Sequence, residues 1–212
     1  MLTLLRCISV VFSNALFAIG RWVILPFPKL LPRYFALRER LVRILDPQGS
    51  CWYTCYLNRW YKFYTRYPKL TQLPEEPCSY IETLVEDVGV CFEAIVRCSD
   101  LASEYARAEK WREAEEMLRR CYGLAAQWLR TPVKERHRSP YDFLIPKIAT
   151  AILVGLWLIE KARQEGKELR IDPAYQRGVW VFGLASNMGI DTSTLNFLHA
   201  QAHRHVRELK NG

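Results

Sequence analysis

The sequence predicts an all-α protein, a helical bundle of antiparallel helix hairpins with a basic, apolar and aromatic N-terminal segment. Three observations support this fold class. Apolar residues recur at spacings of three and four over 79–102 and again over 111–128, which is typical of helices with one buried face. The run 148–159 is apolar on all sides, as in a helix at the centre of a core. Alternating apolar and polar runs, which indicate strands, are scarce.

Length and charge limit the class of protein further. The 212 residues are half apolar, which is enough for a real core and excludes global disorder. The net charge of +8 is uneven, because residues 1–74 carry 11 bases and 2 acids whereas residues 75–131 carry 7 bases and 12 acids. A first third that is basic, aromatic and apolar favours a membrane surface or nucleic acid as a partner.

These shifts in composition predict three parts. Residues 1–32 form a hydrophobic membrane-associating or targeting segment, residues 33–74 form a basic aromatic helical region, and residues 75–212 form a helical domain. Each boundary is placed at a proline-containing stretch, where regular structure tends to end.

The first segment contains an uncharged run of 14 residues between Arg6 and Arg21. That is short of the ~20 residues that a membrane-spanning helix needs. Four interpretations are open: a cleaved signal peptide, an organellar transit peptide, a retained short or interfacial membrane helix, and an ordinary buried helix. We favour the retained helix, which predicts a membrane-associated protein, in an organelle or elsewhere. A buried helix predicts a cytoplasmic protein instead.

The prolines between Pro26 and Pro32 predict a bent linker, since each removes a backbone donor and disfavours helix before it. Residues 33–45 then read as a short amphipathic helix rich in arginine. The sequence Asp-Pro-Gln-Gly over 46–49 predicts a turn.

The stretch 51–67, CWYTCYLNRWYKFYTRY, holds eight aromatic residues, three bases and no acid. As a helix that ends before Pro68, it places its bases on a stripe beside a stripe of aromatics. Core packing, a belt at a membrane interface and a stacking platform for nucleic acid are all open. The predicted contacts with a partner or an anionic surface are Trp52, Tyr56, Arg59, Trp60, Lys62, Phe63, Arg66 and Tyr67.

Ser79 and Glu82 have the spacing of a capping box, which predicts one helix from Ser79 through Ala102. A second helix over 111–128 completes an antiparallel hairpin. Part of this hairpin resembles a tetratricopeptide repeat, with Leu101-Ala102-x2-Tyr105 followed by Ala114-x3-Leu118. The resemblance covers one hairpin, and no second copy follows at the 34-residue period of such repeats.

The apolar run 148–159 is twelve residues long, which favours a buried central helix over a membrane span. Asp172 and Pro173 suit the first positions of the next helix. Over 181–200, a corner at Gly189 between two helical runs looks like a helix-turn-helix. The candidate nucleic-acid contacts of that hairpin are Thr192, Ser193, Asn196 and Arg204.

Signatures of catalysis and metal binding are missing from the sequence. There is no Gly-rich phosphate loop, no H-E-x-x-H and no G-x-S-x-G. His199 and His203 share a helix face but have no carboxylate or thiol placed beside them, so neither a metal nor a cofactor is predicted. The seven cysteines lack metal-ligand spacing, and they predict reduced, buried thiols.

The leading hypothesis is a non-enzymatic, membrane-associated helical interaction protein, an accessory subunit or an assembly or scaffold factor of a larger complex. Its expected partners are proteins of that complex and a membrane surface, without a small-molecule substrate. The alternative is a nucleic-acid-binding helical protein with a helix-turn-helix-like hairpin at its C-terminal end.

Overall fold

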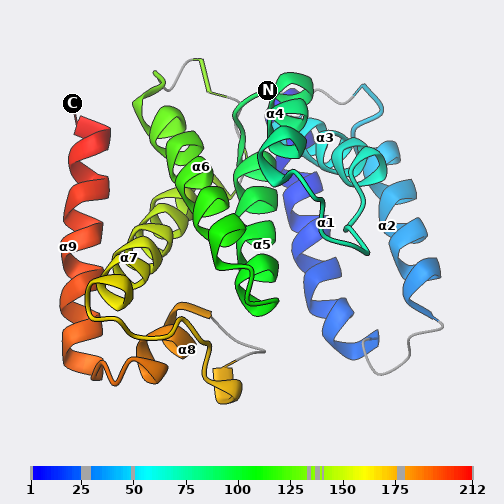
Figure 1. Ribbon diagram of the computed structural model, residues 1–212. Coiled ribbons are helices and arrows are strands. Elements are labelled where there is room, and N and C mark those ends of the chain that lie inside the picture. The colour runs from blue at the N-terminus through cyan, green and yellow to red at the C-terminus, as the bar shows by residue number, and fades with distance from the viewer. Residues whose placement is uncertain are drawn as a thin grey trace. The chain divides into compact units, whose positions relative to one another are not determined.

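The computed structural model describes residues 2–24, 30–48, 51–132, 135–136, 139, 141–175 and 180–211. Over these residues it contains nine α-helices and no strand, so the predicted all-α class is confirmed (Figure 1). The chain divides after Pro68 into two compact units, with α1–α3 in the first and α4–α9 in the second. The first unit therefore combines the hydrophobic N-terminal segment with the arginine-rich and aromatic helices.

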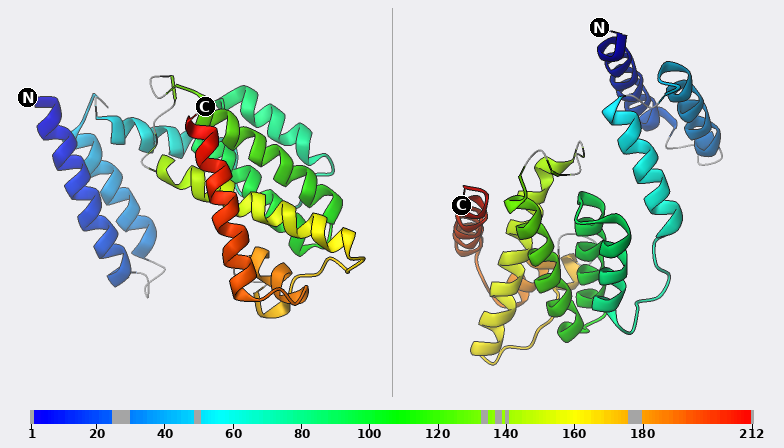
Figure 2. Two further views of the ribbon diagram at one scale, coloured as in Figure 1. Left: turned by 90° about the vertical axis from the view of Figure 1, so that its left-hand side faces the viewer. Right: turned by 90° about the horizontal axis from the view of Figure 1, so that it is seen from above.

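The N-terminal unit is a helical hairpin joined by a third helix. Its helices are α1 (Leu2–Ile24), α2 (Leu31–Leu45) and α3 (Trp52–Arg66). α1 and α2 lie side by side and antiparallel, as the views in Figures 1 and 2 agree. Val10, Val42 and Cys51 form a small buried cluster where residues of α1, of α2 and of the start of α3 meet.

Two features of this unit follow from local sequence. The backbone N–H of Cys51 donates to Oδ2 of the buried Asp46 over 2.8 Å, so the carboxylate ties the residue before α3 back to the end of α2. α2 starts earlier than predicted, because Pro32 lies in its first turn, where the missing N–H would have had no helical partner. The rest of the predicted proline linker, residues 26–29, lies outside the described residues.

The C-terminal unit contains six helices. They are α4 (Pro77–Val88), α5 (Phe92–Arg107), α6 (Trp111–Arg130), α7 (Ile145–Gln164), α8 (Trp180–Asn187) and α9 (Thr192–Asn211). α5 and α6 form the predicted antiparallel hairpin, and α4 packs against both. The residues of the tetratricopeptide-like pattern are buried in that hairpin: Leu101, Ala102, Tyr105, Ala114 and Leu118.

α7 lies at the centre of this unit and packs against α5, α6, α8 and α9 (Figure 2). Leu158 and Ile159 are fully buried, as expected for the predicted central helix. Among the described residues, Asp142–Gln164 is also the one stretch long and apolar enough to cross a membrane, and half of its most apolar window is buried. Its four helical neighbours are those of a core helix.

The single helix predicted over 79–102 is wrong, because Gly89 divides it into α4 and α5. Gly89 has φ 73° and ψ 175°, a conformation open to glycine alone, and it interrupts the helical hydrogen bonds before Phe92 starts α5. The capping box at Ser79 is wrong as well. Pro77 begins α4 at its first position, so Ser79 already lies inside the helix.

Asp172 caps a shorter element than predicted. Its Oδ1 accepts the N–H of Ala174 over 3.0 Å at the start of a 3₁₀ turn, Pro173–Tyr175, whereas α8 begins at Trp180. Its Oδ2 accepts the hydroxyl of Ser186 over 2.7 Å. These two hydrogen bonds, that from Ser186 first, lower the pKa of Asp172. Asp172 thus joins the turn to α8.

The predicted corner at Gly189 is present between α8 and α9. Gly189 has φ 69°, and the N–H of Ile190 donates to the carbonyl of Ala185 while the N–H of Gly189 donates to that of Ser186, both over 2.9 Å. This pair of bonds is a Schellman motif, which ends a helix with a left-handed residue.

We expect Gly189→Val to lower the free energy of unfolding by about 1–2 kcal/mol, because a β-branched residue is strained at positive φ. A Cβ at this position would meet no atom within 4 Å, so backbone strain is the whole effect. Chemical denaturation measures the change. Gly123→Val is the control, since Gly123 lies in regular helix and has equally open space. Equal stability of the two variants would contradict the prediction.

Candidate membrane and partner surfaces

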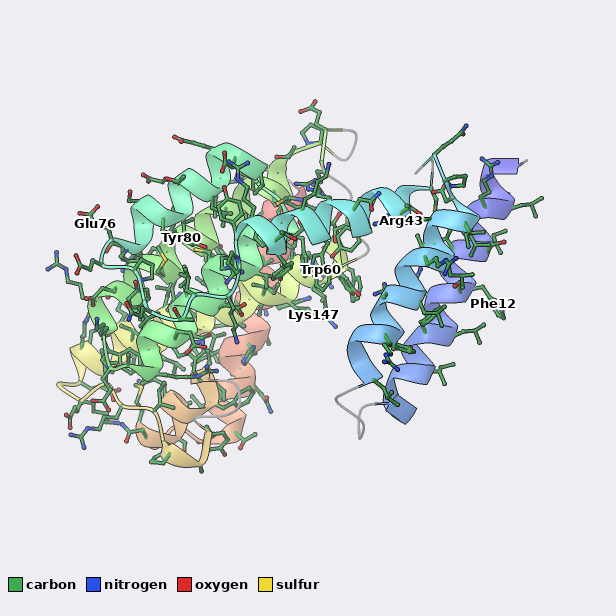
Figure 3. All side chains as sticks on the ribbon, turned by 90° about the vertical axis from the view of Figure 1, so that its right-hand side faces the viewer. Phe12, Arg43, Trp60, Glu76, Tyr80 and Lys147 are labelled. Carbon is green, nitrogen blue, oxygen red and sulfur yellow. The ribbon has the colours of Figure 1, made fainter. Side chains whose placement is uncertain are left out.

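One side of α1 is covered by large apolar side chains that face solvent. Seven positions recur at helical spacing, and at 100° per residue they fall within an arc of about 140°. In Figure 3 the side chain of Phe12, which is 64 % exposed, points away from α2. No charged residue belongs to this arc. We call it the outer apolar face of α1, and it comprises Leu4, Leu5, Ile8, Val11, Phe12, Leu16 and Ile19.

The opposite side of α1 is buried and carries polar groups. Val10, Ser13 and Asn14 are all less than 9 % exposed. Asn14 Nδ2 donates to the carbonyl of Val10 over 2.8 Å, and Nε of Arg38 from α2 donates to Asn14 Oδ1 over 2.7 Å. A surface helix of a soluble protein has the reverse arrangement, with apolar residues inside and polar ones outside.

α3 does not present its predicted aromatic residues as one uniform surface. Tyr56 and Phe63 are buried, each 4 % exposed, whereas Trp60 is 40 % exposed and lies edge-on to Tyr64 at 4.8 Å between ring centroids. Tyr67 is half-buried, and the side chain of Trp52 lies outside the described residues.

The three bases of α3 also differ in exposure. Lys62 and Arg66 are exposed and Arg59 is half-buried. The Arg66 guanidinium lies 5.7 Å from the ring centroid of Tyr67, within range of a cation–π contact. The contact of this helix with a partner or an anionic surface stays a prediction.

The candidate nucleic-acid contacts are all exposed on α9: Thr192, Ser193, Asn196 and Arg204. Asp191 precedes them and caps the helix, since its Oδ1 accepts the hydroxyl of Ser193 over 2.6 Å and the N–H of Thr194 over 2.7 Å. These hydrogen bonds, with that from Ser193 the largest, lower the pKa of Asp191, so the carboxylate is charged at neutral pH. A fixed anion therefore occupies the helix end that would approach a phosphate backbone.

The histidines of α9 lie in different surroundings. His199 is half-buried and stacks on Phe182 of α8 at 6.0 Å between ring centroids, and burial lowers its pKa. His203 and His205 are exposed. Within the described ranges no group of three or more His, Cys, Asp or Glu residues is arranged to hold a metal. Phe197, 61 % exposed, gives the same helix an apolar side chain in solvent.

A groove of about 410 Å³ lies between the starts of α4 and α6, and sequence reasoning missed it. Four carboxylates and one base line it, which leaves the groove acidic: Glu75, Glu76, Glu113, Glu116 and Arg112. Cys78 also lines it, and burial together with a hydrogen bond to Glu116 raises the pKa of this thiol to about 11. The thiol is therefore protonated at neutral pH and is a poor nucleophile. Residues from 75 to 116 build the groove, so no local pattern revealed it.

None of the six cysteines whose side chains are described forms a disulfide. Four are buried and two, Cys7 and Cys78, are half-buried. Cys98 Sγ donates to the carbonyl of Met117 over 3.5 Å, and Cys121 Sγ donates to that of Ile95 over 3.3 Å, so both thiols join α5 to α6. Burial first, and the nearby Cys98 second, raise the pKa of Cys121. These thiols pack as small hydrophobic groups.

The chain was compared with family models, curated proteins and solved structures, and none of the three comparisons found a match.

Proposed function

We propose that this chain is a non-enzymatic, membrane-associated helical interaction protein. Its N-terminal unit holds it at a membrane surface, and its C-terminal unit binds a protein partner as an accessory subunit or scaffold of a larger complex. The outer apolar face of α1 carries the proposal. Its seven large apolar side chains recur at helical spacing, and each is 44–66 % exposed. A continuous apolar patch of this kind marks a surface that contacts a membrane or another protein.

The free energy gained by removing this face from water is comparable with the stability of a small protein domain. Removing a large apolar side chain from water is worth roughly 1.5–3 kcal/mol when it is fully buried. With about half of each side chain exposed, the seven together supply roughly 5 kcal/mol or more. That is sufficient for strong partition into the boundary between headgroups and acyl chains, where amphipathic helices lie.

The C-terminal unit supports the second half of the proposal through one acidic groove. The acidic groove between α4 and α6 suits a basic segment of a partner protein, whereas the N-terminal unit is basic. The basic N-terminal unit and this acidic groove therefore suit different partners, since an acidic surface is repelled by anionic lipid and by nucleic acid alike.

A membrane fractionation tests this function. We expect the wild-type chain to sediment with membranes and to stay there through a high-salt wash, because apolar partition is not screened by salt. Phe12→Glu should shift the protein to the soluble fraction. Phe197→Glu is the matched control, since Phe197 is 61 % exposed and Phe12 is 64 % exposed, and it should leave the distribution unchanged.

Recovery of the wild type in the soluble fraction would contradict membrane association. Release by salt, together with sensitivity to nuclease, would favour the nucleic-acid alternative, because affinity for nucleic acid falls steeply with salt.

A further inference from the structure

A second surface of the N-terminal unit mixes bases with apolar side chains. On α2, Arg33 and Arg40 are exposed, and Leu37 and Ile44 are 60 % and 67 % exposed. Their successive spacings of four, three and four residues place all four on one side of the helix. We call these residues the mixed stripe of α2. It differs from the outer apolar face of α1, which carries no charge.

The mixed stripe is incompatible with the hydrocarbon core of a bilayer. An arginine at the centre of a membrane helix costs roughly 2.5–3.5 kcal/mol. The uncharged part of α1 is also too short to cross the core by itself. Its 14 uncharged residues between Arg6 and Arg21 extend about 21 Å at 1.5 Å per residue, against a core of about 30 Å. Both helices instead suit a position in the plane of the membrane interface. The arginines of the mixed stripe then lie among the lipid headgroups, and its leucine and isoleucine contact the acyl chains.

The polar contacts within the α1–α2 hairpin are compatible with a position at the membrane interface. The bond from Arg38 to Asn14 joins α2 to α1, and the bond from Asn14 to Val10 lies within α1 on its buried side, away from the outer face. Paired polar groups of this kind keep their strength in surroundings of low dielectric constant, where unpaired ones would be costly. The two helices therefore hold together as one element at the membrane.

Charge identifies the lipid. Residues 1–68 contain 10 Lys or Arg and 2 Asp or Glu, so this part of the chain carries a net charge of +8. An anionic leaflet attracts a nearby base by about 1 kcal/mol, whereas a zwitterionic leaflet offers no such net attraction. A purely hydrophobic anchor would gain nothing from arginines on α2.

We propose that the α1–α2 hairpin lies in the plane of an anionic phospholipid leaflet, and that Arg33 and Arg40 select this leaflet by pairing with its headgroups. The inference rests on the proposed membrane association and adds the lipid class and the selecting residues. The outer apolar face of α1 supplies affinity for any bilayer, and the mixed stripe of α2 supplies the preference among bilayers.

The experiment measures flotation of the full chain with vesicles of phosphatidylcholine alone and of phosphatidylcholine mixed with phosphatidylglycerol. We expect the wild type to bind the anionic vesicles more tightly. Arg33→Gln with Arg40→Gln should weaken that binding about 30-fold, from about 1 kcal/mol per lost charge, and should leave binding to phosphatidylcholine unchanged. Arg33→Lys with Arg40→Lys should retain the preference, since the charge is kept.

The control removes two exposed arginines from the other unit, by Arg130→Gln on α6 with Arg207→Gln on α9, and should leave both affinities unchanged. Equal wild-type binding to the two vesicle types would overturn the inference and leave the proposed function standing. A preference that survives in the Arg33→Gln, Arg40→Gln protein would also overturn it, by placing the selecting bases elsewhere. Binding to neither vesicle would overturn the proposed function together with the inference.

Discussion

Replacing Gly155 by valine is expected to lower the free energy of unfolding by about 3 kcal/mol, through overpacking in the core. Gly155 is buried in the middle of α7, where the ring of Trp180 from α8 lies directly on the backbone. A Cβ at this position would come within 2.5 Å of Trp180 Cη2 and 2.9 Å of Cζ2. The ring is only 7 % exposed, so it has little room to move away.

Two alanine variants distinguish the effect of this close contact on stability from the effect of helix propensity. Ala is about 1 kcal/mol better than Gly inside a helix, and Gly123→Ala in α6 should therefore stabilise the protein, because a Cβ there meets nothing within 4 Å. Gly155→Ala should destabilise it despite the same gain. Chemical denaturation of both variants gives the two signs, and stabilisation by Gly155→Ala would contradict the close contact.

A double-mutant cycle identifies Trp180 as the cause. Gly155→Val should cost less in a Trp180→Ala background than in the wild type, since the clashing ring is gone. Equal costs in the two backgrounds would show that another neighbour is responsible.

Glu115→Gln is expected to lower the free energy of unfolding by about 2 kcal/mol at neutral pH, because the charged hydrogen bonds of the carboxylate are lost. Glu115 of α6 is 9 % exposed. Its Oε1 lies 2.8 Å from Nη2 of Arg119, and its Oε2 accepts from Arg163 of α7. This carboxylate therefore joins α6 to α7 through its ionic contact with Arg163.

The same interaction depends on pH. Burial raises the pKa of Glu115, but the hydrogen bonds from Arg119 and Arg163 outweigh it, and the net pKa lies below the usual 4.5. A carboxylate with a lowered pKa stabilises the fold fully above the unfolded value and loses this contribution as pH falls through the folded value. The stability difference between wild type and Glu115→Gln should therefore be largest above about pH 5 and shrink below about pH 4.

Denaturant unfolding at several pH values measures this difference. Glu160→Gln on α7 is the control, because Glu160 is exposed, and its effect should stay within about 0.5 kcal/mol. A difference between wild type and Glu115→Gln that is independent of pH would contradict the ionic contact.

Much of the helical structure follows from local sequence. The aromatic helix α3 ends before Pro68 as predicted, because proline disfavours helix in the residue before it. The corner at Gly189 follows from the freedom of glycine at positive φ. Gly89 is the same kind of signal, but the apolar periodicity on both sides of it favoured one continuous helix, and the prediction failed there.

The candidate surfaces were predictable only in part. The uncharged run between Arg6 and Arg21 identified α1 as a membrane candidate from composition alone. The direction of its apolar residues was open, because almost every side of this helix carries some apolar residue. The part-buried bond from Arg38 to Asn14 decides which side faces α2, and the two partners are 24 residues apart.

The sequence by itself determined the helical class, the basic and acidic parts of the chain and the main breaks between helices, since these depend on periodicity, charge and the backbone limits of proline and glycine. Tertiary structure alone decided which faces are covered. The ring of Trp180 on Gly155, the bond of Glu115 to Arg163 and the groove between α4 and α6 join residues 25 or more positions apart. Helical periodicity specifies which residues share a face, and packing between distant helices decides what that face contacts.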